Sequence, residues 1–550
     1  MIHKLTDIIL SYVEALSLNK DERDNFLNCL QIILGNQENR DSQHSISPIS
    51  LSECQLLLAH LNERTSRRKK DGVYYTPEDV TEYMVLNAFN CYCCPDVTNV
   101  YTTEFLYNQL SSQSGTIIKR LLSAIVFDPT CGAGEFLLTA FRVKYHLLKQ
   151  TRKHVTDSDI IHLLATIHGN DIEDDSIRIT KARLLIDCFS LIQDKKQIKL
   201  ILKAIEGHFS NEDYVSTIRP EEPQYDILLG NPPFVEYSTL KKRPEGGFGN
   251  VYCDVINNIC HETTKNGVMA FVVPLSYVST PRMNKIRTTV SSSFPKQFVL
   301  SFADRPDCLF VSAHHKLFIL IGAKRSTRDT KGVYTSTYYY WYKSERDKLF
   351  HNLNTNRNNN LTTNCFPKLG CHIEVSLYNK THNGGAPLFD LLNNNGTTKP
   401  IYLNMRGCFW MKAFSFNPGS SEYKAFHVKE ENYDFIACLL NSSLFFTQWI
   451  ALSDCWHITQ KELLNFRVPK DSISDSTIFH TLFKKLEKKL ESTKVYIGSK
   501  QAEYEYKHRL CKNIIDEIDD ALSAVYKLSP EELQYVKAFN LKYRLSNDEQ

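Results

Sequence analysis

The sequence lacks any apolar run that approaches the ~18 consecutive residues of a membrane-spanning helix. Its first residues, MIHKLTDIILSYVEAL, are amphipathic and include acidic side chains, unlike a signal or transit peptide. We therefore expect no membrane partner and a cytoplasmic location.

A strong charge of either sign is missing as well. The formal net charge of +3 is too small to indicate a nucleic-acid partner by itself. Basic residues gather in two short runs, at residues 64–70 and 241–243. Such runs are usually solvated loops, but the second directly follows a motif described below, which favours a role beside a site.

Paired cysteine motifs are absent too. The 16 cysteines are scattered through a long chain, which predicts reduced thiols and no disulfide framework. Only CYCC at residues 91–94 is clustered, and no histidine or second cysteine pair stands at zinc-finger spacing from it. We expect buried or near-surface thiols there, with structural zinc as the minor alternative, and no catalytic metal.

What is present is the composition of a globular protein, with 42% hydrophobic and 23% charged residues over 550 positions. Residues 1–66 show apolar positions at helical spacing. From about 71 to 325, short apolar strands alternate with amphipathic helices, a pattern typical of an α/β fold with a parallel sheet. The strands are expected at residues 124–127, 166–169, 225–229, 268–273, 297–302 and 317–321.

The composition changes after residue 325. TYYYWYK is followed by NTNRNNN, which predicts a loop, and charged helices are expected from about 474 to 525. Ser529 followed by Pro530 and Glu532 signals one more helix start. We therefore divide the chain into a helical extension (1–70), a Rossmann-like α/β domain (71–325) and a mixed C-terminal domain (326–550).

The stretch AIVFDPTCGAGEF, at residues 124–136, predicts a strand, a glycine turn and a helix start. Gly132 and Gly134 let the backbone approach a ligand, but the GxGxxG fingerprint of dinucleotide sites is absent. Asp128 precedes the glycines, which suits a ligand that carries an ammonium group. A turn without any ligand is an equal alternative for this stretch taken alone.

Two more acids follow the next strands. Asp171 comes at the end of the second strand, where a carboxylate can accept hydrogen bonds from ribose hydroxyls, and Asp213 in NEDYV can accept one from an adenine amino group. Ligands of open α/β sheets bind at this carboxyl edge. The three acids together predict S-adenosylmethionine as the cofactor.

The fourth strand runs into Asn231, Pro232, Pro233 and Phe234. Two prolines end a strand and hold a rigid loop. The Asn231 side-chain oxygen and the Pro232 carbonyl can each accept a hydrogen bond from an exocyclic amine, which aims the nitrogen lone pair at a methyl donor. Phe234 offers a face for base stacking, worth ~1–3 kcal/mol. The alternative is a proline-terminated strand whose phenylalanine packs in the core.

This order of motifs resembles the gamma-class amino-methyltransferases that modify N6 of adenine in DNA, found in restriction–modification and phage-defence systems. The likeness covers roughly residues 70–325: GVYYTPEDVTEYMV, DPTCGAGEF, GNDIEDDSI, NEDYV and GNPPF are similar to successive family motifs. It implies cofactor contacts from eight residues: Tyr75, Thr76, Asp128, Thr130, Gly132, Gly134, Asp171 and Asp213. It also implies that Asn231, Pro232, Pro233 and Phe234 hold an adenine flipped out of double-stranded DNA. Phenylalanine replaces the commoner tyrosine of this motif.

Residues 330–550 resemble, more faintly, the target-recognition regions of single-chain members. No PD…(D/E)xK motif is found, so we expect methylation without cleavage, with a separate restriction endonuclease as a possible partner and a monomer or homodimer as the working form. Three alternatives remain open: a modification subunit that needs a separate specificity subunit, a methyltransferase acting on cytosine N4, RNA or protein glutamine, and a non-catalytic DNA-binding or assembly protein.

Overall fold

The computed structural model describes residues 2–35, 47–63, 75–217, 222, 224–239, 247–310, 314–393, 398–469, 476–498 and 502–546. Both basic runs singled out in the sequence, at 64–70 and 241–243, lie outside the described residues, as do residues 72–74 of the first motif.

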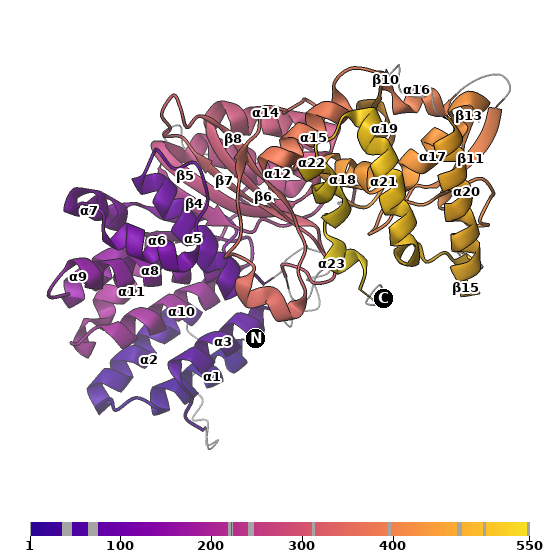
Figure 1. Cartoon of the computed structure of the whole chain (residues 1–550). Coiled ribbons are helices and arrows are strands. Elements are labelled where there is room, and N and C mark those ends of the chain that lie inside the picture. Colours follow the sequence, from indigo (N-terminus) through magenta and orange to yellow (C-terminus); the bar gives the residue numbers. More distant parts are fainter. Residues whose placement is uncertain are drawn as a thin grey trace.

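The N-terminal region is helical, as its periodicity predicts. It consists of α1 (Ile2–Glu14), α2 (Lys20–Leu34) and α3 (Leu51–Glu63). A capping box on Asn19 starts α2, and Gly35 ends it with a φ of 78°. Of these helices, α2 and α3 contact α10 (Asp174–Leu191), a helix of the α/β region, and α1 contacts α3; together they form the indigo end of the molecule in Figure 1.

A twisted sheet forms the centre of the molecule. Within the described residues it has nine strands in the order β3-β2-β1-β4-β5-β7-β6-β8-β9. Their bounds are β1 Val126–Asp128, β2 Ile167–Asn170, β3 Phe209–Ser210, β4 Tyr225–Gly230, β5 Thr263–Pro274, β6 Lys296–Phe302, β7 Leu317–Ala323, β8 Gly332–Tyr339 and β9 Asn356–Arg357. All six predicted strands are present, and the Rossmann-like α/β fold class is confirmed.

The expectation of purely parallel pairing is wrong for one strand. β7 runs antiparallel to both neighbours, β5 and β6. The reason is the connection: no described helix lies between residues 303 and 316, so the chain turns back beside β6 instead of crossing over the sheet.

The sheet also continues past residue 325, because β8 pairs parallel to β6 and β9 pairs with β8. The Asn-rich run predicted as a loop outside the core contains β9, and Asn358 is buried. Its amide donates to Thr335 Oγ1 (3.1 Å) and to the Pro367 carbonyl (2.7 Å), which explains how a polar side chain is accommodated there. The domain boundary at 325 stays a prediction.

Helices cover both faces of the sheet (Figure 1). α5 (Glu78–Cys93) and α8 (Glu135–Thr151) pack together on one face, and α12 (Val251–Glu262) and α14 (Asn284–Ser293) pack together on the other. The remaining helices of this region are α6 Thr103–Ser111, α7 Gly115–Ser123, α9 Asp157–Leu164, α11 Ile198–Glu206 and α13 Ser276–Ser279. Cys91 and Cys93 of the CYCC cluster are buried in α5, and burial raises their thiol pKa values to about 11 and about 12.

The C-terminal region is mixed, as expected. Its strands are β10 Ala386–Pro387, β11 Thr398–Asn404, β12 Ala413–Phe414, β13 Tyr423–Lys429, β14 Arg467–Val468, β15 Val495–Tyr496 and β16 Tyr504–Glu505. Its helices are α15 His372–His382, α16 Leu388–Leu392, α17 Tyr433–Asn441, α18 Ser443–Leu452, α19 Gln460–Asn465, α20 Ser476–Thr493, α21 Lys512–Tyr526, α22 Pro530–Ala538 and α23 Leu541–Arg544. The predicted helix start at Ser529 is confirmed by a complete capping box on α22.

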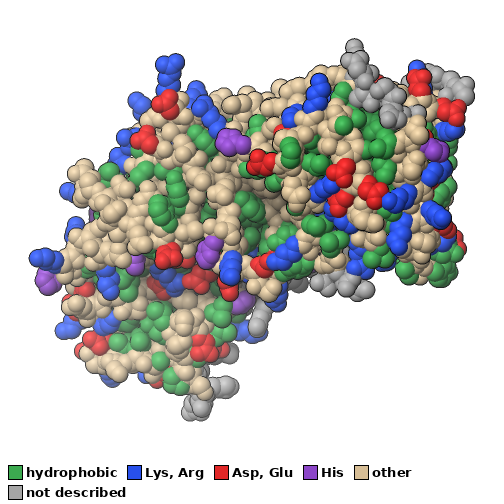
Figure 2. Space-filling model, in the orientation of Figure 1, with side chains coloured by type: hydrophobic (Ala, Val, Ile, Leu, Met, Phe, Trp, Pro, Cys, Tyr) green, Lys and Arg blue, Asp and Glu red, His purple; other side chains and the backbone are tan. Residues whose placement is uncertain are grey.

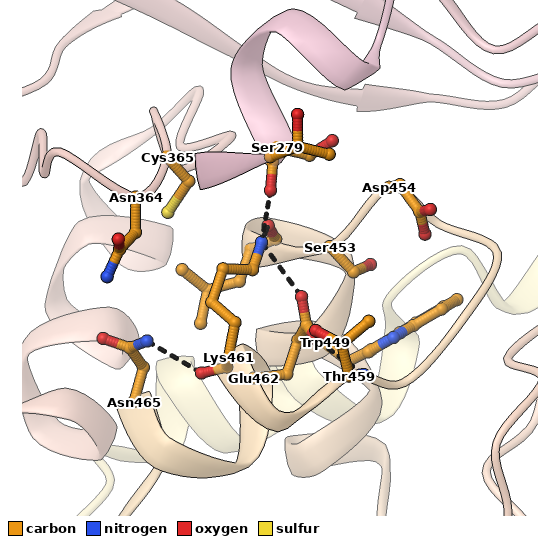
Figure 3. A network of polar contacts seen from close by, with 12 residues as sticks. Ser279, Asn364, Cys365, Trp449, Ser453, Asp454, Thr459, Lys461, Glu462 and Asn465 are labelled. Atoms are coloured by element: carbon orange, nitrogen blue, oxygen red, sulfur yellow. Dashed lines mark hydrogen bonds and ion pairs between the residues drawn. The ribbon is translucent and has the colours of Figure 1, made fainter. Parts of the chain in front are cut away.

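A partly buried lysine of this region contacts α13, the short helix that follows β5. Figure 3 shows Lys461 of α19 pointing at the Ser279 carbonyl that ends α13. The ammonium group donates to that oxygen (2.5 Å) and to the Leu452 carbonyl (2.6 Å), and it lies 3.0 Å from Glu462 Oε1. Because the lysine side chain is only 10% exposed, these charge-assisted bonds hold α19 and α13 in a fixed relation.

Among the helices that the structure describes, none is by itself long and apolar enough to cross a membrane. One bent pair, Glu430–Asn441 with Ser443–Leu452, passes that test by length and composition, with 65° between its halves.

Candidate active site at the carboxyl edge of the sheet

Strand direction brings the predicted site residues together. β1, β2 and β4 run parallel, so the loops that follow Asp128, Asn170 and Gly230 emerge at one edge of the sheet. The glycine turn, Asp171 and the loop that begins at Asn231 are therefore neighbours. β3 also pairs parallel to β2, which places Asp213 beyond the same edge.

The turn after β1 requires its glycines. Asp128 Oδ1 accepts the N–H of Thr130 at 2.9 Å, and Gly132 and Gly134 follow with φ of 55° and 86°. A Cβ on Gly134 would lie 2.7 Å from Thr180 Cγ2 of α10, besides forcing a side chain into the left-handed region. The turn therefore packs directly on α10 before α8 begins at Glu135.

Two carboxylates are linked through this turn. Asp171 Oδ2 accepts the N–H of Gly132 (2.8 Å), and Oδ1 accepts the N–H of Glu173 (2.9 Å). Burial raises the pKa of Asp171 to about 6, although both backbone donors act in the opposite direction. Burial also raises the pKa of Asp128 well above its ordinary value, with the Asp171 charge adding to the effect. A cationic ligand group beside Asp128 would favour its ionised form.

The residues fit the predicted cofactor. The Thr130 hydroxyl is buried, and within the described residues it has no hydrogen-bond partner. A buried hydroxyl needs a hydrogen-bond partner, and a polar group of a ligand bound at the site can supply one. Ile172, directly after Asp171, is 65% exposed, and an exposed apolar side chain beside the expected ribose position suits the face of a base. Sequence reasoning missed Ile172, whose only signal is its place next to Asp171 in GNDIEDD.

The predicted catalytic loop, residues 231–234, is tied to the first motif by a hydrogen bond. Asn231 Nδ2 donates to Thr76 Oγ1 at 3.1 Å, and Thr76 is buried. With the amide nitrogen directed at Thr76, the side-chain oxygen is the atom of the Asn231 amide that can accept a hydrogen bond from an amine. A Cβ on Gly230, the last residue of β4, would lie 2.8 Å from Asp128 Oδ1, so the catalytic loop starts in contact with the cofactor turn.

The two prolines and the phenylalanine follow in the order expected. Pro232 is buried, whereas Pro233 and Phe234 are partly buried. The Phe234 ring meets His315 edge-on, with centroids 6.0 Å apart and planes at 79°. His315 lies on the segment between β6 and β7, so a residue that the sequence analysis did not single out adjoins the catalytic loop.

Two predicted cofactor residues have other contacts in the structure. Tyr75 stacks on His60 of α3, with ring centroids 5.8 Å apart. Asp213 is exposed, and its carboxylate accepts the Val215 N–H (3.1 Å) and the Ser216 hydroxyl (2.7 Å) within its own turn. Within the described residues these bonds do not join Asp213 to the other site residues, and its role stays a prediction.

Three cations surround one tryptophan near this edge. Lys316, Arg406 and Arg305 lie 4.1, 5.0 and 6.0 Å from the Trp456 ring centroid. Lys316 is also paired with Asp304 (3.1 Å) and Arg406 with Glu422 (2.6 Å). Arg305 and Lys316 flank the same β6–β7 segment that carries His315, so the cluster joins the catalytic edge to the C-terminal region.

The face of the molecule drawn in Figure 2 is not uniformly charged. Figure 2 shows Lys and Arg side chains interspersed with Asp and Glu, and a hollow between the sheet region and the C-terminal region on the face drawn. A separate open groove of about 620 Å³ lies on the C-terminal region between α20 and residues 416–419, with Tyr504 and Tyr506 in its lining. That groove contains none of the predicted site residues.

Comparisons with known proteins concern the family and the fold. Residues 165–305, from β2 to β6, match the Eco57I restriction-modification methylase family. None of the curated proteins compared with the sequence matches it. The Type IIL restriction-modification enzyme MmeI, solved in complex with DNA, is 12% identical and aligns over 99% of this chain and 95% of its own, with a TM-score of 0.56.

Other solved structures align less closely. The type IIG restriction endonuclease BpuSI is 10% identical over 100% of this chain and 76% of its own, with a TM-score of 0.45. The DrdV–DNA complex is 11% identical over 58% of this chain, with a TM-score of 0.39, and the alignment spans only 34% of the DrdV chain. These similarities concern the fold alone.

Taken with the site geometry, the family match confirms S-adenosylmethionine as the cofactor. It also confirms the resemblance to restriction–modification DNA methyltransferases, which rests on the match of residues 165–305 to the Eco57I restriction-modification methylase family.

Proposed function

We propose that the chain is a site-specific DNA adenine-N6 methyltransferase of the gamma class. It transfers the methyl group of S-adenosylmethionine and protects or marks DNA in a restriction–modification or phage-defence system, without a nuclease of its own. The observation that carries the proposal is the Asn231–Thr76 hydrogen bond, which directs the asparagine nitrogen away from a substrate amine.

The chain's residues have distinct roles in this reaction. Asn231 Oδ1 and the Pro232 carbonyl accept the two hydrogens of the adenine amino group, so its lone pair stays available for the methyl carbon. S-adenosylmethionine, when bound, would supply the methyl group to this nitrogen, which Asn231 and Pro232 hold in position, and the methylated amine would release one proton to water. Phe234 stacks on the flipped base, offsetting an extrusion cost of a few kcal/mol.

The cofactor is held by the three strand-end acids. Asp128 would pair with its ammonium group, Asp171 would accept from the ribose hydroxyls, and Asp213 would accept from the adenine amine. Tyr75, Thr130, Gly132 and Gly134 complete the pocket. Because the methyl donor is already activated by its positive sulfur, orientation supplies most of the catalysis.

DNA as the substrate is supported by the likeness to MmeI, whose solved complex contains DNA, and by the cations around Trp456. Arg305 and Arg406 are exposed beside the catalytic edge, where each can contact a phosphate. The C-terminal region then reads base edges in the major groove.

The test is methyl transfer from labelled S-adenosylmethionine to mixed-sequence duplex DNA by the purified chain, followed by digestion to nucleosides. We expect the label in N6-methyladenine, and none when Asn231→Ala replaces the wild type at equal cofactor affinity. Label in N4-methylcytosine, in RNA or in protein glutamine would contradict the proposed substrate. Transfer only after a specificity subunit is added would identify a modification subunit.

A further inference from the structure

The N-terminal helices contact α10 through a network of buried, hydrogen-bonded polar side chains that also reaches the cofactor turn. Gln55 of α3 is 4% exposed, Arg183 of α10 is 3% exposed and Asp187 is 3% exposed. Arg183 Nε donates to Gln55 Oε1 at 2.9 Å. The Gln55 amide nitrogen in turn donates to Asp187 Oδ1 at 2.7 Å and to the Arg183 carbonyl at 3.0 Å.

The same arginine holds the cofactor turn. Arg183 Nη1 donates to the Ala133 carbonyl at 2.6 Å and to Glu135 Oε1 at 2.5 Å. Ala133 lies between the two glycines, and Glu135 is the first residue of α8. One turn earlier on α10, Thr180 Oγ1 donates to the Gly132 carbonyl at 2.9 Å. Two carbonyls of the turn are therefore fixed by α10, and one of them depends on Arg183.

The same network of buried side chains also includes an arginine of α8. Arg142 of α8 donates to both oxygens of Asp187, through Nε at 2.6 Å and Nη2 at 3.1 Å. Asp187 thus accepts from Arg142 and from Gln55 at once. Because a guanidinium can satisfy several acceptors only in a fixed plane, the Gln55 amide decides the orientation in which Arg183 reaches the turn.

We propose that Gln55 is a positioning residue for the S-adenosylmethionine site, acting through Arg183 on the Ala133 carbonyl and Glu135. The helices of residues 2–63 therefore set the shape of the cofactor turn and are not only a packing extension. This inference rests on the proposed cofactor pocket but requires nothing of the DNA substrate.

The test variant is Gln55→Met, which keeps the length and burial of the side chain and removes both amide functions. It leaves a buried guanidinium N–H without its acceptor, so we expect the Kd for S-adenosylhomocysteine to rise about tenfold. The KM for S-adenosylmethionine should rise with it, while kcat at saturating cofactor stays near the wild-type value.

The matched control is Arg178→Met. Arg178 also links α10 to the N-terminal helices, since its Nη1 donates to the Leu34 carbonyl at 2.7 Å, but it has no contact with the glycine turn among the bonds described. This variant is expected to lower the melting temperature without changing the Kd. Equal weakening by both variants would mean that general loosening of the helices, and not Gln55, affects the site.

A Gln55→Met chain that binds S-adenosylhomocysteine as tightly as the wild type would overturn the inference. A wild-type chain that binds none would instead overturn the cofactor pocket itself, so the two failures differ. Hydrogen exchange on the wild type gives a second measurement that needs no variant. Coupling is reciprocal, so the ligand should slow exchange in the peptide 51–63, and unchanged exchange there would contradict the coupling.

Discussion

Replacing Asp171 by asparagine tests the geometry of the cofactor pocket. The carboxylate accepts the N–H groups of Gly132 and Glu173 on separate oxygens, at 2.8 and 2.9 Å. An asparagine has one side-chain oxygen, so one of these donors would face the amide NH2 group. The variant also loses a charge-assisted hydrogen bond to the ribose, worth ~1.5–3 kcal/mol.

That loss predicts a Kd for S-adenosylhomocysteine about 10- to 150-fold above wild type. The stability of the empty protein should change less, because the neutral amide relieves the burial that raises the pKa of Asp171 to about 6. Titration calorimetry measures the first quantity and thermal unfolding the second.

Asp174→Asn is the matched control, because it is the same substitution three residues further along the chain. Its side chain is 54% exposed and pairs with Arg178 on the helix surface, so its removal should alter the Kd by less than about twofold. An Asp171→Asn protein with the same Kd as Asp174→Asn would refute the assignment of Asp171 to the cofactor.

Four further predictions concern pH, stacking, the domain junction and DNA contacts. Because the pKa of Asp171 is raised to about 6, its ionised, binding-competent form is lost as the pH falls. The Kd of the wild type for S-adenosylhomocysteine should therefore rise about tenfold from pH 7 to pH 5. A Kd that does not change over this range would contradict the prediction. Phe234→Ala should lower kcat/KM for DNA by about 5- to 150-fold and Phe234→Tyr or Phe234→Trp by much less, whereas equal losses in steady-state assays would exclude stacking. Lys461→Met should lower the free energy of unfolding by ~1–3 kcal/mol in denaturant titrations, because the carbonyls that Lys461 contacts lose their donor. The control is Lys484→Met. The Lys484 side chain is 58% exposed, so this variant should change the free energy of unfolding by less than ~0.5 kcal/mol. The double variant Arg305→Gln/Arg406→Gln should reduce the salt-dependence slope of DNA binding by about 2. The control Arg152→Gln, at the far end of α8 about 25 Å from the glycine turn, should leave the slope unchanged. Equal slopes for the double variant and the wild type would mean that Arg305 and Arg406 do not contact DNA.

The sheet could be predicted from sequence because its strands are buried runs bounded by polar turns. Each predicted strand overlaps an observed one, and β1, β2 and β4 end within one residue of their expected ends. The direction of β7 could not be predicted, because apolar runs of parallel and antiparallel buried strands look alike. β8 was missed because its aromatic and threonine-rich sequence lacks the continuous aliphatic pattern of the other strands.

The candidate site was predicted where its residues follow strands directly. Contacts between distant segments left no signal in the sequence: Thr76 and Asn231 are 155 residues apart, and Gln55 and Arg183 are 128 apart. The same holds for His315, which reaches Phe234 only because β7 turns back along the sheet. Asp213 shows the opposite case, since a strand-end acid satisfied within its own turn looks identical in sequence to one that faces a ligand.

The most direct test of the account is to map modified bases in DNA from a methylation-free host that expresses the chain alone. We predict N6-methyladenine at one recurring sequence with the wild type, none with Asn231→Ala, and a lower modified fraction with Phe234→Ala at a matched, low expression level. Unmodified adenines in the presence of a folded, cofactor-binding wild-type chain would contradict the proposal that this protein is a self-sufficient adenine methyltransferase.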